Sequence, residues 1–413
     1  MLKIRLYLIL SVLVIFSLGS TSGEPVYAEA LDSLVNEALA QNPGIQAAHS
    51  RWEASRYRAR QVSALPDPSA RYTYFGESVE TKVGPQEHKY GVTQKVPFPG
   101  KLYLKGKTEF KHSEMLREKY EAAKREVIKE VKFAYYDLFW IDKAIEISEE
   151  EKRILISLEN AARMRFETRH SPQEDAIKAA VEISKLINKL YKLGQHRKGM
   201  EAKINSLLSR PRGTRLGKII NLVTTEFNYD LNVLHDLARS NRQELIAANL
   251  DTERAKYERS LAGLGYLPDF SFGFDYIQVG DGTTGFDNDG QDAWTTTFAV
   301  HVPLWLDKRV SGVREKQAAF EATKKKYEDV KNTLDYEVED VYYKVNTYRD
   351  IVKLYKTALI PQTEQAFGAA KTAYETGKVD FLNWLDSERV LLRTRIAYYK
   401  AIVDYEKSIA YLE

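Results

Sequence analysis

The side chains that could do chemistry in this sequence are scattered and form no recognisable catalytic motif. The chain has seven His and no Cys, and its His residues show no paired metal-ligand spacing. It also contains no nucleophile motif, no phosphate-binding loop and no dinucleotide fingerprint. We therefore expect a protein that is not an enzyme, with no catalytic residue, no cofactor and no metal site.

Two acidic stretches need separate interpretation. Residues 280–292, rich in Asp and Gly, partly resemble a calcium-binding loop. They lack the Glu that closes such a loop at its twelfth position, so we favour an exposed loop without an ion. Glu149, Glu150 and Glu151 are predicted to form the solvated face of a helix.

The N-terminus has the order of a secretory signal. Lys3 and Arg5 precede an apolar run over residues 6–18, and small residues follow up to Ala28. The apolar run is shorter than the ~20 residues of a membrane-spanning helix. We predict a signal peptide over residues 1–28 and an exported mature chain.

The 61 basic and 58 acidic side chains nearly balance, so no basic surface indicates nucleic-acid binding.

The mature chain repeats itself once, at a spacing of about 200 positions. The Leu-Pro-Asp of residues 65–67 returns at 267–269, and the Val-Pro of residues 96–97 returns at 302–303. This pattern indicates one duplication of a large unit. We predict a first repeat over residues 29–213, a linker over 214–230 and a second repeat over 231–413.

Each repeat shows the same order of periodicities: a helix, an alternating hairpin, a very long helix and a return helix. We expect helices over residues 31–64, 104–169, 172–208, 231–264, 310–376 and 381–412. Pro361 falls inside one long helix and should kink it or interrupt its hydrogen bonds. Helices this long need partners beside them, because no globular core requires them.

The hairpins alternate between apolar and polar side chains. In the second repeat the apolar positions are Phe270, Phe272, Phe274 and Tyr276. Four strands of about 9–11 residues suit tilted membrane-spanning strands. Four strands alone would leave unpaired edges in lipid, so closure requires several protomers, and three would give twelve strands. The alternative is a small soluble sheet with one half-buried face.

The ordered motifs resemble the TolC family of outer-membrane efflux proteins. They are Leu-Pro-Asp before each hairpin, Val-Pro-Phe-Pro-Gly-Lys (96–101) and Val-Pro-Leu-Trp (302–305) after it, and the segment 373–386, which is similar to a periplasmic helix–helix turn of the family. The resemblance implies a mainly α protein with a β-barrel portion. Long antiparallel helices would form a trimeric tunnel, with four transmembrane strands per protomer and a twelve-stranded barrel per trimer.

The resemblance also implies a function, partners and a location. The chain would be the outer-membrane channel subunit of a tripartite efflux system in a Gram-negative bacterium and would extend into the periplasm. It would act as a passive exit duct for substrates delivered by an inner-membrane pump through a periplasmic adaptor protein. The Pro-Phe-Pro-Gly-Lys form resembles that of members paired with heavy-metal pumps, and the family resemblance implies a pump of the resistance-nodulation-division type. The alternative is a periplasmic coiled-coil adaptor or scaffold without a pore, which would not need four alternating strands.

Two groups of residues take roles from this resemblance. The pore gate would contain Asp175, Tyr374, Asn383 and Asp386, and the adaptor-docking rim would contain His170, Ser171, Gly377, Lys378 and Val379. Asn383 replaces an Asp often found in the family, and Val379 stands where an Arg can link neighbouring coils. Alternatively, Asp175 and Asp386 are solvated carboxylates at helix starts, favoured by the helix dipole.

Overall fold

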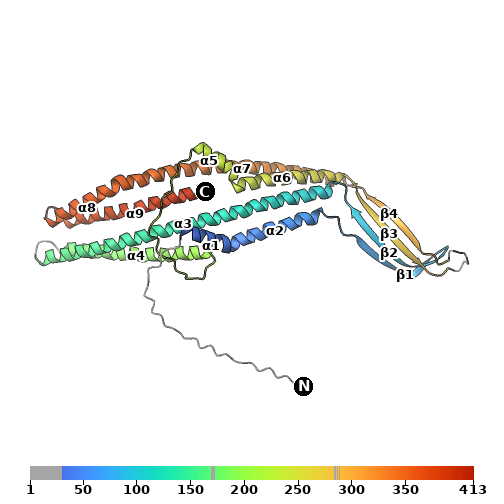
Figure 1. Ribbon diagram of the computed structural model, residues 1–413, viewed down its shortest axis with the longest axis horizontal. Coiled ribbons are helices and arrows are strands. Elements are labelled where there is room, and N and C mark those ends of the chain that lie inside the picture. Colours follow the sequence, from blue (N-terminus) through green and yellow to red (C-terminus); the bar gives the residue numbers. More distant parts are fainter. Residues whose placement is uncertain (1–29, 169–172, 283–284, 286, 288) are drawn as a thin grey trace, which may run out of the picture.

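The protein is long and narrow, with a helical body that carries a small sheet at one end (Figure 1). A computed structural model describes residues 30–168, 173–282, 285, 287 and 289–413. The predicted signal peptide, residues 1–28, therefore lies outside the described part, as do His170 and Ser171. None of the described helices is long and apolar enough to cross a membrane.

The elements follow the same order twice along the chain. The first series is α1 (Leu31–Gln41), α2 (Pro43–Ser63), β1 (Ser69–Thr81), β2 (Gly84–Val96), α3 (Lys101–Glu167) and α4 (Gln173–Leu207). The second is α5 (Leu231–Asn241), α6 (Gln243–Gly263), β3 (Asp269–Val279), β4 (Ala293–His301), α7 (Leu306–Leu354), α8 (Ile360–Glu375) and α9 (Phe381–Leu412). A short 3-10 turn, Leu264–Tyr266, follows α6. The strands are 13, 13, 11 and 9 residues long, so the first hairpin is longer than the sequence pattern predicted.

The first helix of each repeat is broken, whereas the sequence predicted one continuous helix. Asn42 is extended, and its Oδ1 accepts hydrogen bonds from the N–H groups of Gly44 (2.8 Å) and Ile45 (3.2 Å). Pro43 follows at the first helical position, and its ring disfavours the helical conformation for the residue before it, Asn42. The second repeat breaks at the corresponding Arg242, which is also extended but has no side-chain cap.

The long helices pair into two hairpins, α3 with α4 and α8 with α9 (Figure 1). The 67 residues of α3 make a rod of roughly 100 Å. The second rod is interrupted where Pro361 predicted an interruption. A five-residue π-helix, Tyr355–Leu359, separates α7 from α8 immediately before this proline. A proline removes one backbone donor, and the wider π turn accommodates that loss.

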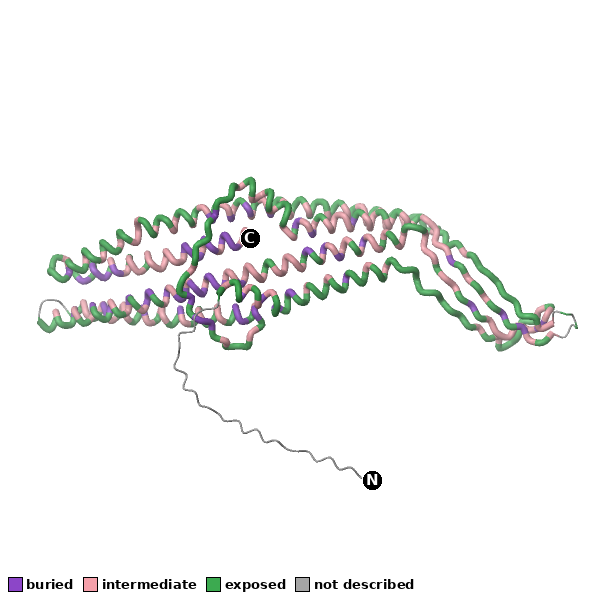
Figure 2. Tube along the Cα trace, viewed as in Figure 1, coloured by how far each residue is buried: buried purple, intermediate pink, exposed green. Residues whose placement is uncertain are grey.

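The segment between the repeats is bound tightly to the helices. It crosses the middle of the body, where buried residues concentrate (Figure 2). The buried carboxylate of Asp142 accepts hydrogen bonds from Arg197 Nε (2.7 Å) and Ile219 N (3.0 Å). The equally buried Glu406 accepts from the N–H and the hydroxyl of Thr225, both at 2.8 Å. The segment thus fastens α3, α4 and α9 together at mid-length.

Candidate functional site

The four strands form one antiparallel sheet in the order β1-β2-β3-β4. The register aligns one aromatic side chain from each strand: Tyr72 opposite Tyr90, Tyr90 opposite Tyr276, and Tyr276 opposite Trp294. All four side chains are exposed in the protomer, by 39 to 65 %. They make a continuous row across the whole sheet, which we call the aromatic row.

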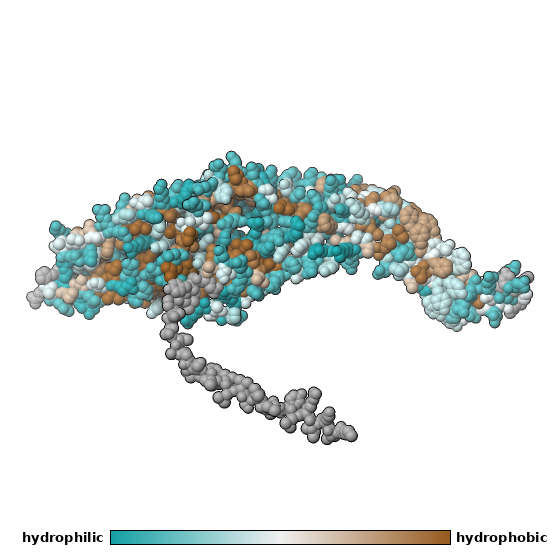
Figure 3. Space-filling view, viewed as in Figure 1, coloured by the Kyte–Doolittle hydropathy of each residue, from teal (hydrophilic) through white to brown (hydrophobic). Residues whose placement is uncertain are grey.

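Apolar side chains continue on this face toward the helices. Phe274, Phe272 and Phe298 are about half exposed. From Trp294 to Val300 the strand advances roughly 20 Å. Exposed Val302, Leu304 and Trp305 extend the apolar surface further, and Figure 3 shows it at the end of the sheet nearest the helices. The height of this surface is comparable with the ~25 Å apolar band of outer-membrane barrels.

The opposite face of the sheet is polar. Arg71, Asp275 and Thr295 lie at equivalent register positions, and Lys89 Nζ lies 3.3 Å from Asp275 Oδ2. Charged and apolar side chains therefore separate onto two faces, as the alternation predicted. In the described protomer β1 and β4 each pair on one side only, so the sheet has two open edges.

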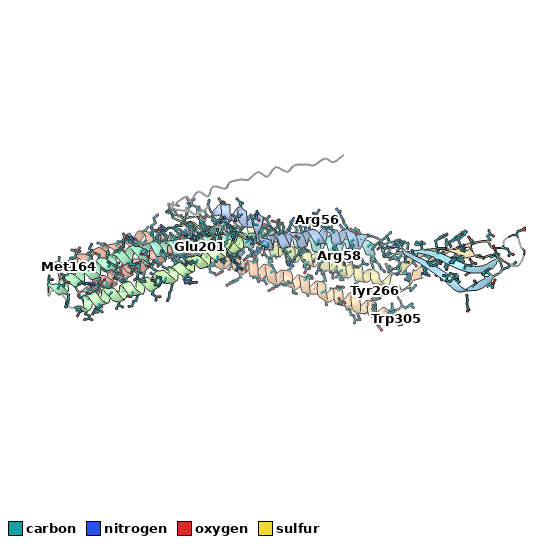
Figure 4. The ribbon with its side chains drawn as sticks, turned by 90° about the horizontal axis from the view of Figure 1, so that it is seen from below. Arg56, Arg58, Met164, Glu201, Tyr266 and Trp305 are labelled. Atoms are coloured by element: carbon teal, nitrogen blue, oxygen red, sulfur yellow. The ribbon has the colours of Figure 1, made fainter. Side chains whose placement is uncertain are left out.

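The family-like motifs meet where the sheet joins the helices. Asp269, from the second Leu-Pro-Asp, accepts hydrogen bonds from the Phe98 N–H and from Lys101 Nζ, both at 2.8 Å. The same Nζ donates to the Leu267 carbonyl oxygen at 2.9 Å. The motif after the first hairpin and the motif before the second hairpin thus bind each other and join the two repeats. Exposed Tyr266 and Trp305 lie at this junction (Figure 4).

The opposite end of the body carries the turn between α8 and α9. Gly377 has φ of 73°, the left-handed conformation that glycine adopts at low cost. The Lys378 N–H donates to the Ala373 carbonyl at 2.8 Å and the Gly377 N–H to the Tyr374 carbonyl at 3.0 Å, a Schellman cap. Asp380 then caps α9 by accepting from the Asn383 N–H at 2.9 Å. The helix–helix turn predicted within residues 373–386 is therefore present, centred on Gly377.

The four predicted gate residues occupy three different environments. Asn383 and Asp386 are exposed and lie three residues apart, on one face of α9. Tyr374 is buried, stacked on Trp384 with ring centroids 4.9 Å apart. Asp175 is partly buried in the first turn of α4. Only Asn383 and Asp386 therefore share an open surface in the protomer, and the gate remains a prediction.

Partial burial affects the ionisation of Asp175. Desolvation raises the pKa of its carboxyl group, and the negative charges of Glu174 and Asp380 add to that shift. Lys178 and Arg165 oppose it without cancelling it.

In the predicted docking rim, Gly377 and Lys378 are exposed, whereas Val379 packs partly against the apolar core of the tip.

Sequence reasoning missed Arg165, which joins the two hairpins at the tip. From the last turn of α3, its Nη1 donates to the Tyr374 carbonyl at 3.0 Å and its Nη2 to the Glu375 carbonyl at 3.4 Å. Its guanidinium carbon lies 4.6 Å from the centroid of the Tyr374 ring. A cation at a helix end was visible in the sequence, but its acceptors lie on a helix far along the chain.

The predicted solvated face at residues 149–151 is wrong for Glu151. Glu149 and Glu150 are accessible, but Glu151 is only 6 % exposed and faces Glu388 of α9, which is 3 % exposed. The physical reason is helical spacing. Glu151 lies four residues from the buried Ile147 and Leu155, so it falls on the apolar stripe of α3. Burial raises the pKa of both carboxyl groups, and their mutual repulsion raises that of Glu388 further.

Comparison with known proteins agrees with this architecture. Residues 234–412 match the family model described as "Outer membrane efflux protein". This segment is therefore similar to an outer membrane efflux protein domain. No curated protein sequence matches the chain. The predicted resemblance to the TolC family is confirmed by the domain and by solved structures of outer-membrane channels.

Three of these structures illustrate the likeness. The channel OprN superposes with a TM-score of 0.81 at 16 % identity, over 92 % of this chain and 88 % of the other. CusC gives 0.79 at 16 % identity, over 96 % and 94 %. VceC from Vibrio cholerae gives 0.78 at 16 % identity, over 92 % and 94 %. The mainly helical fold with a small antiparallel sheet is therefore that of the outer-membrane efflux channels.

Proposed function

We propose that this protein is the outer-membrane channel subunit of a tripartite efflux system. The observation that carries the proposal is the aromatic row with the apolar surface beside it. In a protomer alone this surface faces water, which is unfavourable for a contiguous apolar patch of this size. Aromatic rows that border an apolar band are typical of barrel strands at a membrane interface.

The open edges of the sheet support a trimer. An unpaired strand edge in lipid leaves backbone N–H and C=O groups without partners, at several kcal/mol each. Pairing β1 of one protomer with β4 of the next satisfies these groups. Three protomers of four strands make a twelve-stranded barrel, an even number within the range of outer-membrane barrels. The polar face with Lys89 and Asp275 would then line the channel.

The helical body would form the periplasmic part of the duct. Its far end lies a whole helix length from the aromatic row (Figure 1), which suits contact with a periplasmic adaptor and, through it, an inner-membrane pump. Gly377 and Lys378 are exposed at this end and would form part of the docking rim. Asp386 and Asn383 would narrow the inside of this end, where Asp175 would join them from the first turn of α4. A scaffold without a pore would have no use for the aromatic row.

A pair of substitutions on one strand tests the proposal. Phe298 lies near the middle of the apolar surface, and Thr297 beside it points to the polar face. Phe298→Arg should cost ~2–4 kcal/mol per protomer if this face meets lipid. Thr297→Arg is the matched control. We expect Phe298→Arg to reduce the yield of assembled trimer in outer-membrane fractions, while Thr297→Arg assembles. Equal assembly of both variants would contradict a lipid-facing surface.

A further inference from the structure

Two buried glutamates lie between the two helical hairpins, in the half of the body that is farther from the sheet. Glu151 lies on α3 and Glu388 on α9, so each hairpin contributes one carboxyl group. Both are more than nine-tenths buried in the protomer, and assembly with further copies can only increase that burial. Neither residue belongs to the predicted gate or to the predicted docking rim.

The two carboxyl groups need a hydrogen-bond donor that the described residues around them do not provide. Both residues line the same small cavity, together with side chains of α3, α8 and α9, and each carboxyl group affects the pKa of the other. Oε2 of Glu151 and Oε2 of Glu388 are both buried and have no hydrogen-bond partner among the described residues. Two ionised carboxylates only accept hydrogen bonds and repel each other, whereas a proton on one is donated to the other. One shared proton therefore satisfies both atoms.

Several charged groups surround the pair, and most of them pair with one another. Those that approach it from α3, α4, α8 and α9 are Glu150, Glu182, Lys189, Glu364, Arg389, Arg393 and Arg395. Arg389 pairs with Glu182 at 2.5 Å, and Arg395 pairs with Glu364 at 2.9 Å and Glu150 at 3.5 Å. Lys189 interacts with both buried carboxyl groups. Burial lowers the pKa of Lys189 itself, so this cation also is disfavoured in its charged form.

We infer that Glu151 and Glu388 bind one shared proton and form a pH-sensitive latch between the two hairpins. Protonated, the pair joins α3 to α9. Deprotonated, it places two like charges in a buried contact and drives the hairpins apart. A cavity of about 20 Å³ lined by both residues is large enough for one water molecule, which gives the proton a path to solvent. The significance of this movement for opening a duct rests on the proposed function.

The direction of the pH effect follows from linkage. The pKa of the pair is raised in the packed state above that of exposed glutamates, because burial disfavours charge. The contribution to packing is therefore complete below the ordinary glutamate range and is lost as the pH rises through the raised values. Each unit by which the pKa is raised corresponds to about tenfold in the equilibrium between joined and separated hairpins.

The first test detects the proton itself. Infrared difference spectra between the full-length wild-type protein and Glu388→Gln, both in detergent, should show one protonated carboxyl group that persists near neutral pH. Glu149→Gln is the matched control, since Glu149 lies on α3 two residues before Glu151 but is partly exposed and pairs with Lys152. Its difference spectrum should lack that band. Absence of a protonated carboxyl signal from Glu388 near neutral pH overturns the inference.

The second test detects the latch. Hydrogen exchange of peptides from residues 145–158 and 384–395, corrected for intrinsic rates, should lose protection at least about tenfold between acid and mildly alkaline pH in the wild type. Glu388→Gln and Glu151→Gln each provide a permanent amide donor, so their protection should not vary with pH. Retained pH dependence in both variants overturns the latch, and the second variant serves if one fails to fold. Neither test requires a pore, so failure of the proposed function would appear separately, as absent conductance.

Discussion

Replacing Arg165 with Gln should loosen the contact between the two hairpins at the tip of the body. Arg165 is the residue of α3 that binds the last carbonyl groups of α8 and covers the Tyr374 ring. The substitution removes the charged donor and the cation–π contact together. Tyr374, Phe381 and Trp384 remain as an apolar cluster, but the carbonyl groups at the end of α8 lose their cationic partner.

The magnitude follows from these contacts. The hydrogen bond at 3.0 Å comes from a charged group and is worth ~1.5 kcal/mol at this partly exposed position, and the cation–π contact adds ~0.5–1 kcal/mol. The longer bond at 3.4 Å is left out of the sum. A total of about 2 kcal/mol per protomer corresponds to roughly 30-fold in the packing equilibrium of the tip. Arg165→Lys should lose less, because it retains the charge without the planar fork.

Hydrogen exchange over residues 374–385 measures this change directly. We expect protection to fall roughly 30-fold in Arg165→Gln at constant pH. Arg163→Gln is the matched control, since Arg163 is exposed and pairs only within its own helix among the described contacts, with Glu159. Unchanged protection in Arg165→Gln, or an equal loss in Arg163→Gln, would refute the reasoning that Arg165 holds the hairpins together.

Further predictions concern the turn and the predicted gate. Gly377→Val should strain the left-handed turn by ~1–2 kcal/mol. This strain comes from backbone conformation alone, since no atom lies within 4 Å of an added Cβ. The variant should weaken efflux at equal protein level, whereas Gly377→Asn should be tolerated. Undiminished efflux in Gly377→Val would exclude the rim from docking. Asp175→Asn combined with Asp386→Asn should reduce cation preference in planar-bilayer recordings at low salt and ease closure, and high salt should blunt the difference. Because desolvation raises the pKa of Asp175, its contribution to tip packing is present at acid pH and decreases as the pH rises through that value, and Asp175→Asn should abolish this decrease. A double variant that selects like the parent would leave these carboxylates as solvated helix residues.

The sequence predicted the elements better than the contacts between them. The helix over residues 381–412 has the predicted bounds, and the interruption before Pro361 appears where the missing donor requires it. The breaks at Asn42 and Arg242 were missed, although the Asn-Pro pair signals the first of them. Arg242 carries no such signal, because its extended conformation is repeated from the first unit without a proline or a capping side chain.

Contacts between the repeats could not be predicted from periodicity. The aromatic row depends on the register of β2 against β3, two strands far apart in the chain, which pairs Tyr90 with Tyr276. Glu151 stands in a run of three acidic residues, a pattern typical of solvated helix faces. Only the apolar neighbours one turn away on either side could have indicated burial. Its partner Glu388 belongs to the other repeat, so sequence spacing carried no information about the pair.

The oligomeric state in detergent, measured together with conductance, tests the central claim most directly. Native mass spectrometry of the purified protein should give three copies of the mature chain, and the same preparation should insert into planar bilayers and conduct ions. The proposal predicts a trimer because the four strands of one protomer leave two open edges, and three protomers would supply twelve strands. A protein that remains a monomer without detergent, and that does not conduct, would contradict the account of an outer-membrane channel.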